Sequence, residues 1–177
     1  MVAWLLDKQH IRSNATILEP CAGNGNIAKA VRYSPDIKVI TNDIDLKYNC
    51  DYNLDATLMD LWIATNPVDW VVTNPPYKAE VLEQIMWNSL QRAQRGVAMI
   101  LRLTANEPVI RRGYRGDLLM MFADNLRYLI TFSAPRPSYT GNGKTVSVTT
   151  AWFVWDKNFS WKELGVQSPF QYVVNWR

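Results

Sequence analysis

The feature that most constrains the fold is an alternation of short β-prone runs with segments whose apolar residues recur at helical spacing. Thr16–Leu18 is followed by a glycine turn and then by the helical pattern of Ile27–Val31. Strands separated by helices pair in parallel, because each crossover returns the chain in the same direction. We therefore expect a doubly wound α/β sheet. Its further strands are predicted at Ile37–Thr41, Asp69–Thr73 and Val97–Leu103, with a helix from Val81 to Leu90 before the last of them.

The end of the chain predicts a different connection. Tyr128–Phe132 and Val148–Trp155 are the last two β-like runs, and the segment Ser133–Lys144 between them is rich in proline and glycine. This connection leaves no room for a crossover helix. The last two strands should therefore form an antiparallel hairpin at the end of the sheet.

Length and composition exclude several classes of protein. A chain of 177 residues, 48% hydrophobic and 20% charged, is expected to fold as one globular domain spanning residues 1–177. It has no apolar run of membrane-spanning length and no signal-peptide pattern, so a cytoplasmic protein is expected. Two cysteines, Cys21 and Cys50, and one histidine, His10, give neither a disulfide framework nor a zinc spacing, so no metal is expected. The net charge of +3 is compatible with a polyanionic partner.

A glycine turn lies between the first strand and the first helix. Gly23 and Gly25 permit unusual dihedral angles and let a ligand approach the backbone, although an ordinary βα turn would have the same composition. Asp43 ends the next strand, 20 residues beyond Gly23. That is about the separation at which an acidic residue accepts the ribose hydroxyls of an adenosine-containing cofactor. The two features together indicate an adenosine ligand.

The residues before the glycines distinguish between such ligands. Ala28 takes the third position of a dinucleotide-binding fingerprint, but Glu19 and Pro20 precede the glycines. A carboxylate at this place would repel a pyrophosphate and favour a cation. A sulfonium with an amino-acid tail fits this charge better than NAD does.

A second constellation, Asn74–Tyr77, follows the strand Asp69–Thr73 with the sequence N-P-P-Y. Pro75 and Pro76 stop the strand and hold the backbone, so that the Pro75 carbonyl and the Asn74 side-chain carbonyl are presented together. Two such acceptors match the two N–H bonds of an exocyclic amino group, and Tyr77 offers a flat face to a planar base. The alternative is a proline-rich turn with a capping Asn and a packing Tyr.

These motifs, in this order, resemble the class I S-adenosylmethionine-dependent methyltransferases, and specifically the adenine-N6 branch. The closing stretches Arg136–Tyr139 and Ala151–Trp155 resemble the small phage-encoded type of this branch. The resemblance covers about Thr16 to Trp155. It implies a Rossmann-like, mostly parallel seven-stranded sheet with helices on both faces and a terminal antiparallel hairpin. It implies S-adenosyl-L-methionine as cofactor and DNA as partner, with RNA as an alternative. The length leaves no room for a separate target-recognition domain, so stringent sequence selectivity is not expected.

The resemblance also implies roles for individual residues. The glycine turn would hold the methionine part of the cofactor, Asp43 its ribose, Asp60 its adenine amino group and Leu61 its ring. Asp55 is the alternative to Asp60. The catalytic residues would be Asn74, Pro75, Pro76 and Tyr77. The full cofactor-binding set is Glu19, Pro20, Cys21, Ala22, Gly23, Asn24, Gly25, Asp43, Ile44, Asp60, Leu61 and Asn74.

Basic residues cluster after the predicted strand Val97–Leu103. Arg111, Arg112 and Arg115 should reach the edge of the sheet that carries the N-P-P-Y turn, and Arg136 and Lys144 lie at the two ends of the Pro/Gly-rich connection. We interpret these five residues as phosphate contacts of a nucleic acid. The alternative is ordinary surface charge.

The chemistry that the motifs predict needs no histidine. Hydrogen bonds from both amino hydrogens to Asn74 and to the Pro75 carbonyl would localise the nitrogen lone pair, and the proton becomes acidic once the nitrogen is methylated. In duplex DNA the base must first be flipped out and stacked, a role that suits Tyr77. Methylation of adenine N6 in DNA is the predicted function. RNA adenine-N6 methylation, protein glutamine-N5 methylation and a non-catalytic cofactor-binding partner subunit remain as alternatives.

Overall fold

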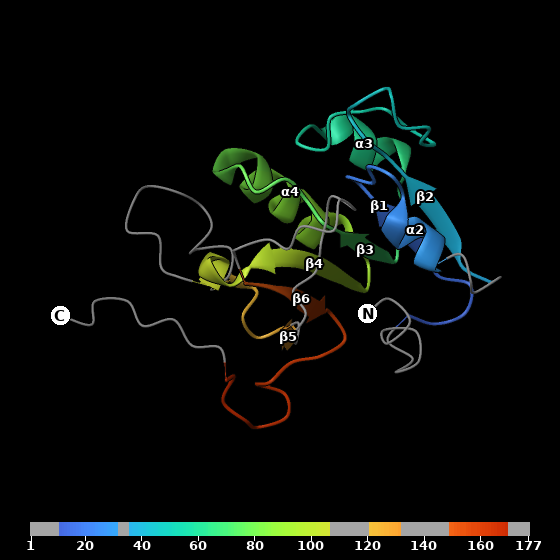
Figure 1. Ribbon diagram of the computed structural model, residues 1–177. Helices are drawn as coiled ribbons and strands as arrows, with labels where there is room; N and C mark the ends of the chain where they lie inside the picture. The colour runs from blue at the N-terminus through green and yellow to red at the C-terminus, as the bar shows by residue number, and fades with distance from the viewer. Residues whose placement is uncertain (1–10, 32–35, 107–120, 132–148, 170–177) are drawn as a thin grey trace.

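The computed structural model describes residues 11–31, 36–106, 121–131 and 149–169 and arranges them around one mixed β-sheet (Figure 1). Within these residues the sheet has six strands in the order β2-β1-β3-β4-β6-β5. The strands are β1 (Thr16–Glu19), β2 (Lys38–Thr41), β3 (Trp70–Thr73), β4 (Gly96–Arg102), β5 (Leu126–Thr131) and β6 (Thr150–Asp156).

The directions of the strands confirm the predicted topology. The pairs β1–β2, β1–β3 and β3–β4 are parallel, whereas β6 is antiparallel to both β4 and β5. Seven strands were expected, and the described residues contain six. The connection from Asn42 to Leu58 contains a single parallel bridge, Asn42–Tyr52, instead of a strand.

Helices cover both faces of the sheet, as a doubly wound fold requires (Figure 1). One apolar cluster joins α3 (Met59–Ala64) and α4 (Ala79–Arg92) to one face, and a second cluster includes Val31 of α2 (Asn26–Val31) on the other. A 3₁₀ turn, η1 (Leu103–Asn106), follows β4. Among the helices that the structure describes, none is both long and apolar enough to cross a membrane. The predicted apolar stripe of α4 is confirmed at its buried residues Leu82, Ile85, Met86 and Leu90.

Charged side chains form hydrogen bonds and ion pairs along the amino edge of the parallel strands. Asp69 accepts hydrogen bonds from the Thr16 backbone N–H at 2.8 Å and from the Arg95 Nε at 2.9 Å. Arg127 and Asp156 form a second ion pair at 2.9 Å. The Asp69 contacts connect β1 to the β3–β4 region, and the Arg127–Asp156 pair joins β5 to β6 at the same edge of the sheet. The carboxyl edge, where Glu19, Thr41, Thr73 and Arg102 end their strands, is built differently.

Gly96, the first residue of β4, is required by packing. A Cβ atom at this position would overlap ring carbons of Trp70 and the main-chain oxygen of Trp155. Trp70 and Trp155 are themselves buried in strands β3 and β6, so neither can move aside easily. Gly96 therefore lets β3, β4 and β6 approach closely at the centre of the sheet.

Replacing Gly96 with Ala should destabilise the protein by about 1–3 kcal/mol, because the added methyl group overpacks the core. The free energy of unfolding, measured by urea denaturation, checks this. Gln94→Ala is the matched control: Gln94 is exposed two residues earlier, so its variant should stay within about 0.5 kcal/mol of wild type. A Gly96→Ala protein as stable as wild type would contradict the packing argument.

Candidate functional site

The predicted glycine turn is formed as the sequence suggested. Gly23 and Gly25 have φ angles of +51° and +70°, in the left-handed region that glycine adopts without strain. A Cβ atom at either position would meet no atom within 4 Å. The turn therefore needs glycine for its backbone conformation, and the space beside it is open to a ligand.

Asp43 joins the end of β2 to this turn. Its Oδ2 accepts a hydrogen bond from the Gly23 backbone N–H at 2.8 Å, and its Oδ1 accepts one from the Asp45 backbone N–H at 3.0 Å. The 20-residue spacing noted in the sequence is thus a direct contact in space. Asp43 holds a negative charge at the mouth of the glycine turn, where it is only partly buried.

Asn42, which sequence reasoning did not single out, organises the same edge. It is fully buried, and its Nδ2 donates to the main-chain oxygens of Pro20 and Leu54, both at 2.9 Å. Its Oδ1 accepts from the Leu54 backbone N–H at 2.9 Å. Its own backbone carbonyl accepts from the Ala22 N–H at 2.8 Å. One side chain therefore fixes the approach to the glycine turn and the loop that follows β2.

Glu19, the last residue of β1, is bonded to the helix that follows the glycine turn. The residue is only 2% exposed, and its Oε2 accepts a hydrogen bond from the Ala28 backbone N–H at 2.8 Å. This bond stabilises the first turn of α2, where backbone N–H groups lack helical partners. The expected role of Glu19 toward a ligand cation stays a prediction.

The surroundings of Cys21 keep its thiol protonated. Burial, and then the charge of Asp43, raise the pKa of the Cys21 thiol to about 12, with smaller contributions from Glu19 and Asp55. Burial and Asp43 also raise the pKa of Cys50. Both thiols are therefore neutral at physiological pH.

The residues expected to contact the adenine of a cofactor lie in different surroundings. Asp60 is exposed in the first turn of α3, and Leu61 is fully buried in the core. Asp55, the alternative, is partly buried in the loop between β2 and α3. Its Oδ1 accepts hydrogen bonds from Thr57. Ile44, next to Asp43, is 65% exposed and offers an apolar surface there.

The N-P-P-Y turn lies at the same edge of the sheet, directly after β3. Pro75 is buried, Pro76 is exposed, and Asn74 and Tyr77 are partly buried. The Tyr77 hydroxyl donates a hydrogen bond to Asn74 Oδ1 at 2.8 Å, an interaction that the sequence pattern did not predict. Because this bond fixes the Asn74 amide, the tyrosine both offers a flat ring and orients the proposed acceptor oxygen.

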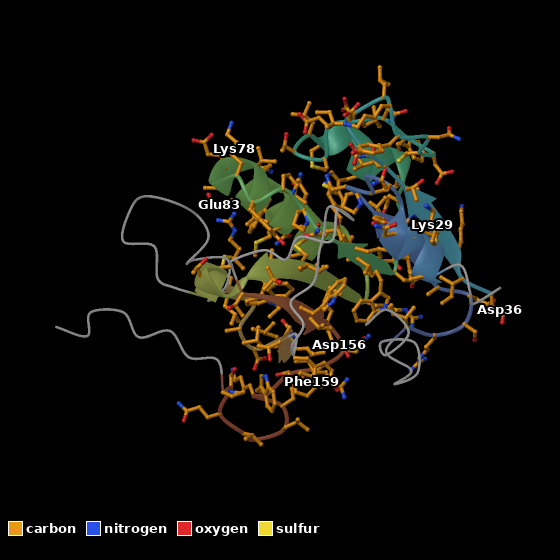
Figure 2. All side chains as sticks on the ribbon, viewed as in Figure 1. Lys29, Asp36, Lys78, Glu83, Asp156 and Phe159 are labelled. Atoms are coloured by element: carbon orange, nitrogen blue, oxygen red, sulfur yellow. The ribbon has the colours of Figure 1, made fainter. Side chains whose placement is uncertain are left out.

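A cavity of about 340 Å³ lies beside the glycine turn. Lys29 of α2, labelled in Figure 2, lines this cavity. Its Nζ donates a hydrogen bond to the Asn24 main-chain oxygen at 2.9 Å. The sequence analysis did not predict that the loop after β2 lines this cavity, because the residues of the loop follow no motif. The lining residues are Ala22, Gly23, Asn24, Gly25, Ala28, Lys29, Thr41, Lys47, Tyr48, Asn49 and Cys50.

The predicted phosphate contacts, Arg111, Arg112, Arg115, Arg136 and Lys144, lie outside the described residues. Within the described part of the chain, no group of three or more His, Cys, Asp or Glu side chains is arranged to hold a metal ion. Three of the predicted features lie on the carboxyl edge of the sheet: the glycine turn, the end of β2 and the N-P-P-Y turn.

Comparison with solved structures shows which fold this is. The methyltransferase subunit of a type I restriction-modification system from Streptococcus thermophilus matches with a TM-score of 0.66 and 15% identity, over 89% of this chain and 43% of that one. A proposed RNA methyltransferase from Pyrococcus horikoshii matches with a TM-score of 0.63 and 14% identity, over 88% and 80%. A dimethyladenosine transferase from Plasmodium falciparum matches with a TM-score of 0.55 and 15% identity, over 89% and 60%.

These likenesses establish the fold. The chain has the Rossmann-like α/β fold of methyltransferases, as predicted. It spans less than half the length of the S. thermophilus subunit. No protein-family model matches the sequence, and no curated protein does so either.

The raised pKa of Cys21 predicts slow alkylation. In a Cys50→Ser variant, which leaves Cys21 as the single thiol, iodoacetamide at pH 8 should react at least about tenfold more slowly with native than with denatured protein. The thiolate fraction is about a thousandfold smaller when the pKa is about 12 instead of 9.0, and the higher nucleophilicity of the thiolate offsets only part of this.

The pH dependence of the alkylation rate separates this cause from simple steric protection. Between pH 8 and 10 the native rate should rise about tenfold per unit, because the thiol stays below its pKa, whereas the denatured rate should level off above pH 9. Native and denatured rates with the same pH profile would contradict the raised pKa of Cys21.

Proposed function

We propose that this protein is an S-adenosyl-L-methionine-dependent methyltransferase that modifies the N6 amino group of adenine in DNA, with residues 1–177 acting as one catalytic domain. The observation that carries the proposal is the juxtaposition of two turns on the carboxyl edge of the sheet. Asp43 contacts Gly23 at one of them, and Tyr77 contacts Asn74 at the other. In doubly wound sheets, ligands bind at this edge.

The residues present fit the cofactor. Open space borders Gly23 and Gly25, and the Asp43 carboxylate at the rim can accept hydrogen bonds from ribose hydroxyls. Ile44 provides an exposed apolar surface for an adenine ring, and Asp60, or Asp55 as the alternative, would accept from its amino group. The Asp43 carboxylate beside Gly23 would also attract the positive charge of a sulfonium. When bound, the cofactor would supply an electrophilic methyl group on a sulfonium.

The chain's own residues would make the acceptor nitrogen reactive. An adenine amino group is a poor nucleophile because its lone pair is delocalised into the ring. Asn74 Oδ1, held by the Tyr77 hydroxyl, has a second lone pair that can accept one amino hydrogen. The rigid backbone at Pro75 would present its carbonyl to the other hydrogen. Both bonds strengthen as positive charge develops on the nitrogen, so they stabilise the transition state more than the ground state.

The choice of DNA rests on several lines of support. The N-P-P-Y turn suits a planar amino nitrogen, and the chain carries a net charge of +3. The solved structures with the same fold include the methyltransferase subunit of a restriction-modification system and a proposed RNA methyltransferase. Transfer to RNA or to a protein glutamine is therefore an outcome that the acceptor experiments must distinguish.

Replacing Asp43 with Ala should weaken cofactor binding at least about tenfold, because hydrogen bonds to a charged group contribute about 1.5–3 kcal/mol each. Calorimetry with S-adenosylmethionine measures this. Asp45→Ala is the matched control: it removes a carboxylate two residues away that pairs with Lys47, and it should leave affinity close to wild type. Equal losses of affinity in the two variants would contradict the ribose assignment of Asp43.

Replacing Asn74 with Ala should lower the methyl-transfer rate about 10²–10³-fold, the usual cost of losing one transition-state hydrogen bond of this kind. Cofactor affinity should stay near wild type, because Asn74 Oδ1 is assigned to the acceptor. Single-turnover transfer to adenine-containing DNA measures the rate. If the variant keeps more than about a tenth of the wild-type rate, the acceptor does not depend on this oxygen.

A further inference from the structure

The ring of Tyr77 has a cationic neighbour that no motif predicts. The guanidinium carbon of Arg102 lies 5.1 Å from the centre of the Tyr77 ring. This is within the range of a cation–π contact, in which the charge lies over the electron-rich face of the ring. One face of the ring is thus covered by Arg102, while the hydroxyl at its end is held by Asn74.

The sheet explains why these two residues meet. Strands β3 and β4 are parallel neighbours, with Thr73 opposite Met99. Tyr77 comes four residues after Thr73, and Arg102 comes three residues after Met99, so both lie just beyond the same edge. The contact is therefore set by the register of the sheet.

Arg102 is the last residue of β4, at the carboxyl edge of the sheet. The residue is exposed, and within the described part of the chain no carboxylate forms an ion pair with it. The arginines at the amino edge differ, because Arg95 and Arg127 are paired with Asp69 and Asp156. A guanidinium that packs its plane near an aromatic ring keeps its N–H groups available at the rim for an anion.

We infer that Arg102 binds the backbone phosphate of the nucleotide whose base is offered to Tyr77 and Asn74. This inference rests on the proposed function and narrows its substrate to a nucleotide within a strand, instead of a free base or nucleoside. The guanidinium of Arg102, whose carbon lies 5.1 Å from the centre of the Tyr77 ring, then meets the phosphate bidentately through its N–H donors.

The test measures binding of a short, fluorescently labelled, adenine-containing single-stranded oligodeoxynucleotide by anisotropy, so that no base has to be flipped from a duplex. Arg102→Met should weaken this binding about ten- to a hundredfold and lower the slope of log affinity against log salt by about 0.7. Arg102→Lys, which keeps the charge and loses the planar fork, should recover part of the loss. Affinity for S-adenosylmethionine should not change in either variant.

Arg92→Met is the matched control. Arg92 is exposed in the last turn of α4, which runs back from the N-P-P-Y turn toward the amino edge of the sheet, and its variant removes the same charge. It should leave oligonucleotide affinity within about twofold of wild type. Equal effects of Arg92→Met and Arg102→Met would overturn the inference, because they would show that only overall charge matters.

A double-mutant cycle tests whether Arg102 and Tyr77 act as one unit. Tyr77→Ala with Arg102→Met should cost less than the sum of the single losses of affinity, since each single change already disturbs the stacked arrangement. Additive losses would overturn the coupling.

A wild-type protein that binds no oligonucleotide would overturn the inference outright. The proposed function is judged separately, by cofactor calorimetry and by methyl transfer, so its failure would be recognised even if Arg102 proves to bind phosphate.

Discussion

The carboxyl edge of the sheet depends on one buried amide. Asn42 has no exposed surface, and its three side-chain hydrogen bonds, to Pro20 and Leu54, satisfy polar backbone groups that would otherwise be buried without partners. By holding the residue before Cys21 and the loop after β2 together, it places the next residue, Asp43, at bonding distance from Gly23. The position of Asp43 relative to the glycine turn follows from this arrangement.

The two edges of the sheet have different charge chemistry. At the amino edge, carboxylates are neutralised by arginines in the pairs Arg95–Asp69 and Arg127–Asp156. At the carboxyl edge, Asp43 and Asp55 accept hydrogen bonds from backbone N–H groups, which leave the negative charge in place. Burial, and then the charge of Asp43, raise the pKa of the Cys21 thiol beside Gly23. The N-P-P-Y turn, with Arg102 over Tyr77, is a separate part of the same edge and carries a cation.

Much of this arrangement is readable in the sequence, because it follows from periodicity and from spacing. The alternation of buried runs and helical stripes predicts the sheet and α4, and the glycine turn predicted after the first strand forms with Gly23 and Gly25 at positive φ. What could not be read is the direction of side chains at strand ends. Glu19 turns under α2 and Leu61 turns into the core, while Arg102 reaches Tyr77 through the register of β3 and β4. These outcomes depend on tertiary packing, which leaves no local pattern.

The most direct test is to incubate the protein with tritiated S-adenosylmethionine and equal amounts of DNA, RNA and denatured protein, and then to separate the three acceptors. The label should enter DNA, and digestion should recover it as N6-methyladenine. The same label should be lost with Asn74→Ala. Label confined to RNA or to protein would contradict the proposed acceptor, and a protein that binds the cofactor tightly yet labels none of the three would contradict catalysis altogether.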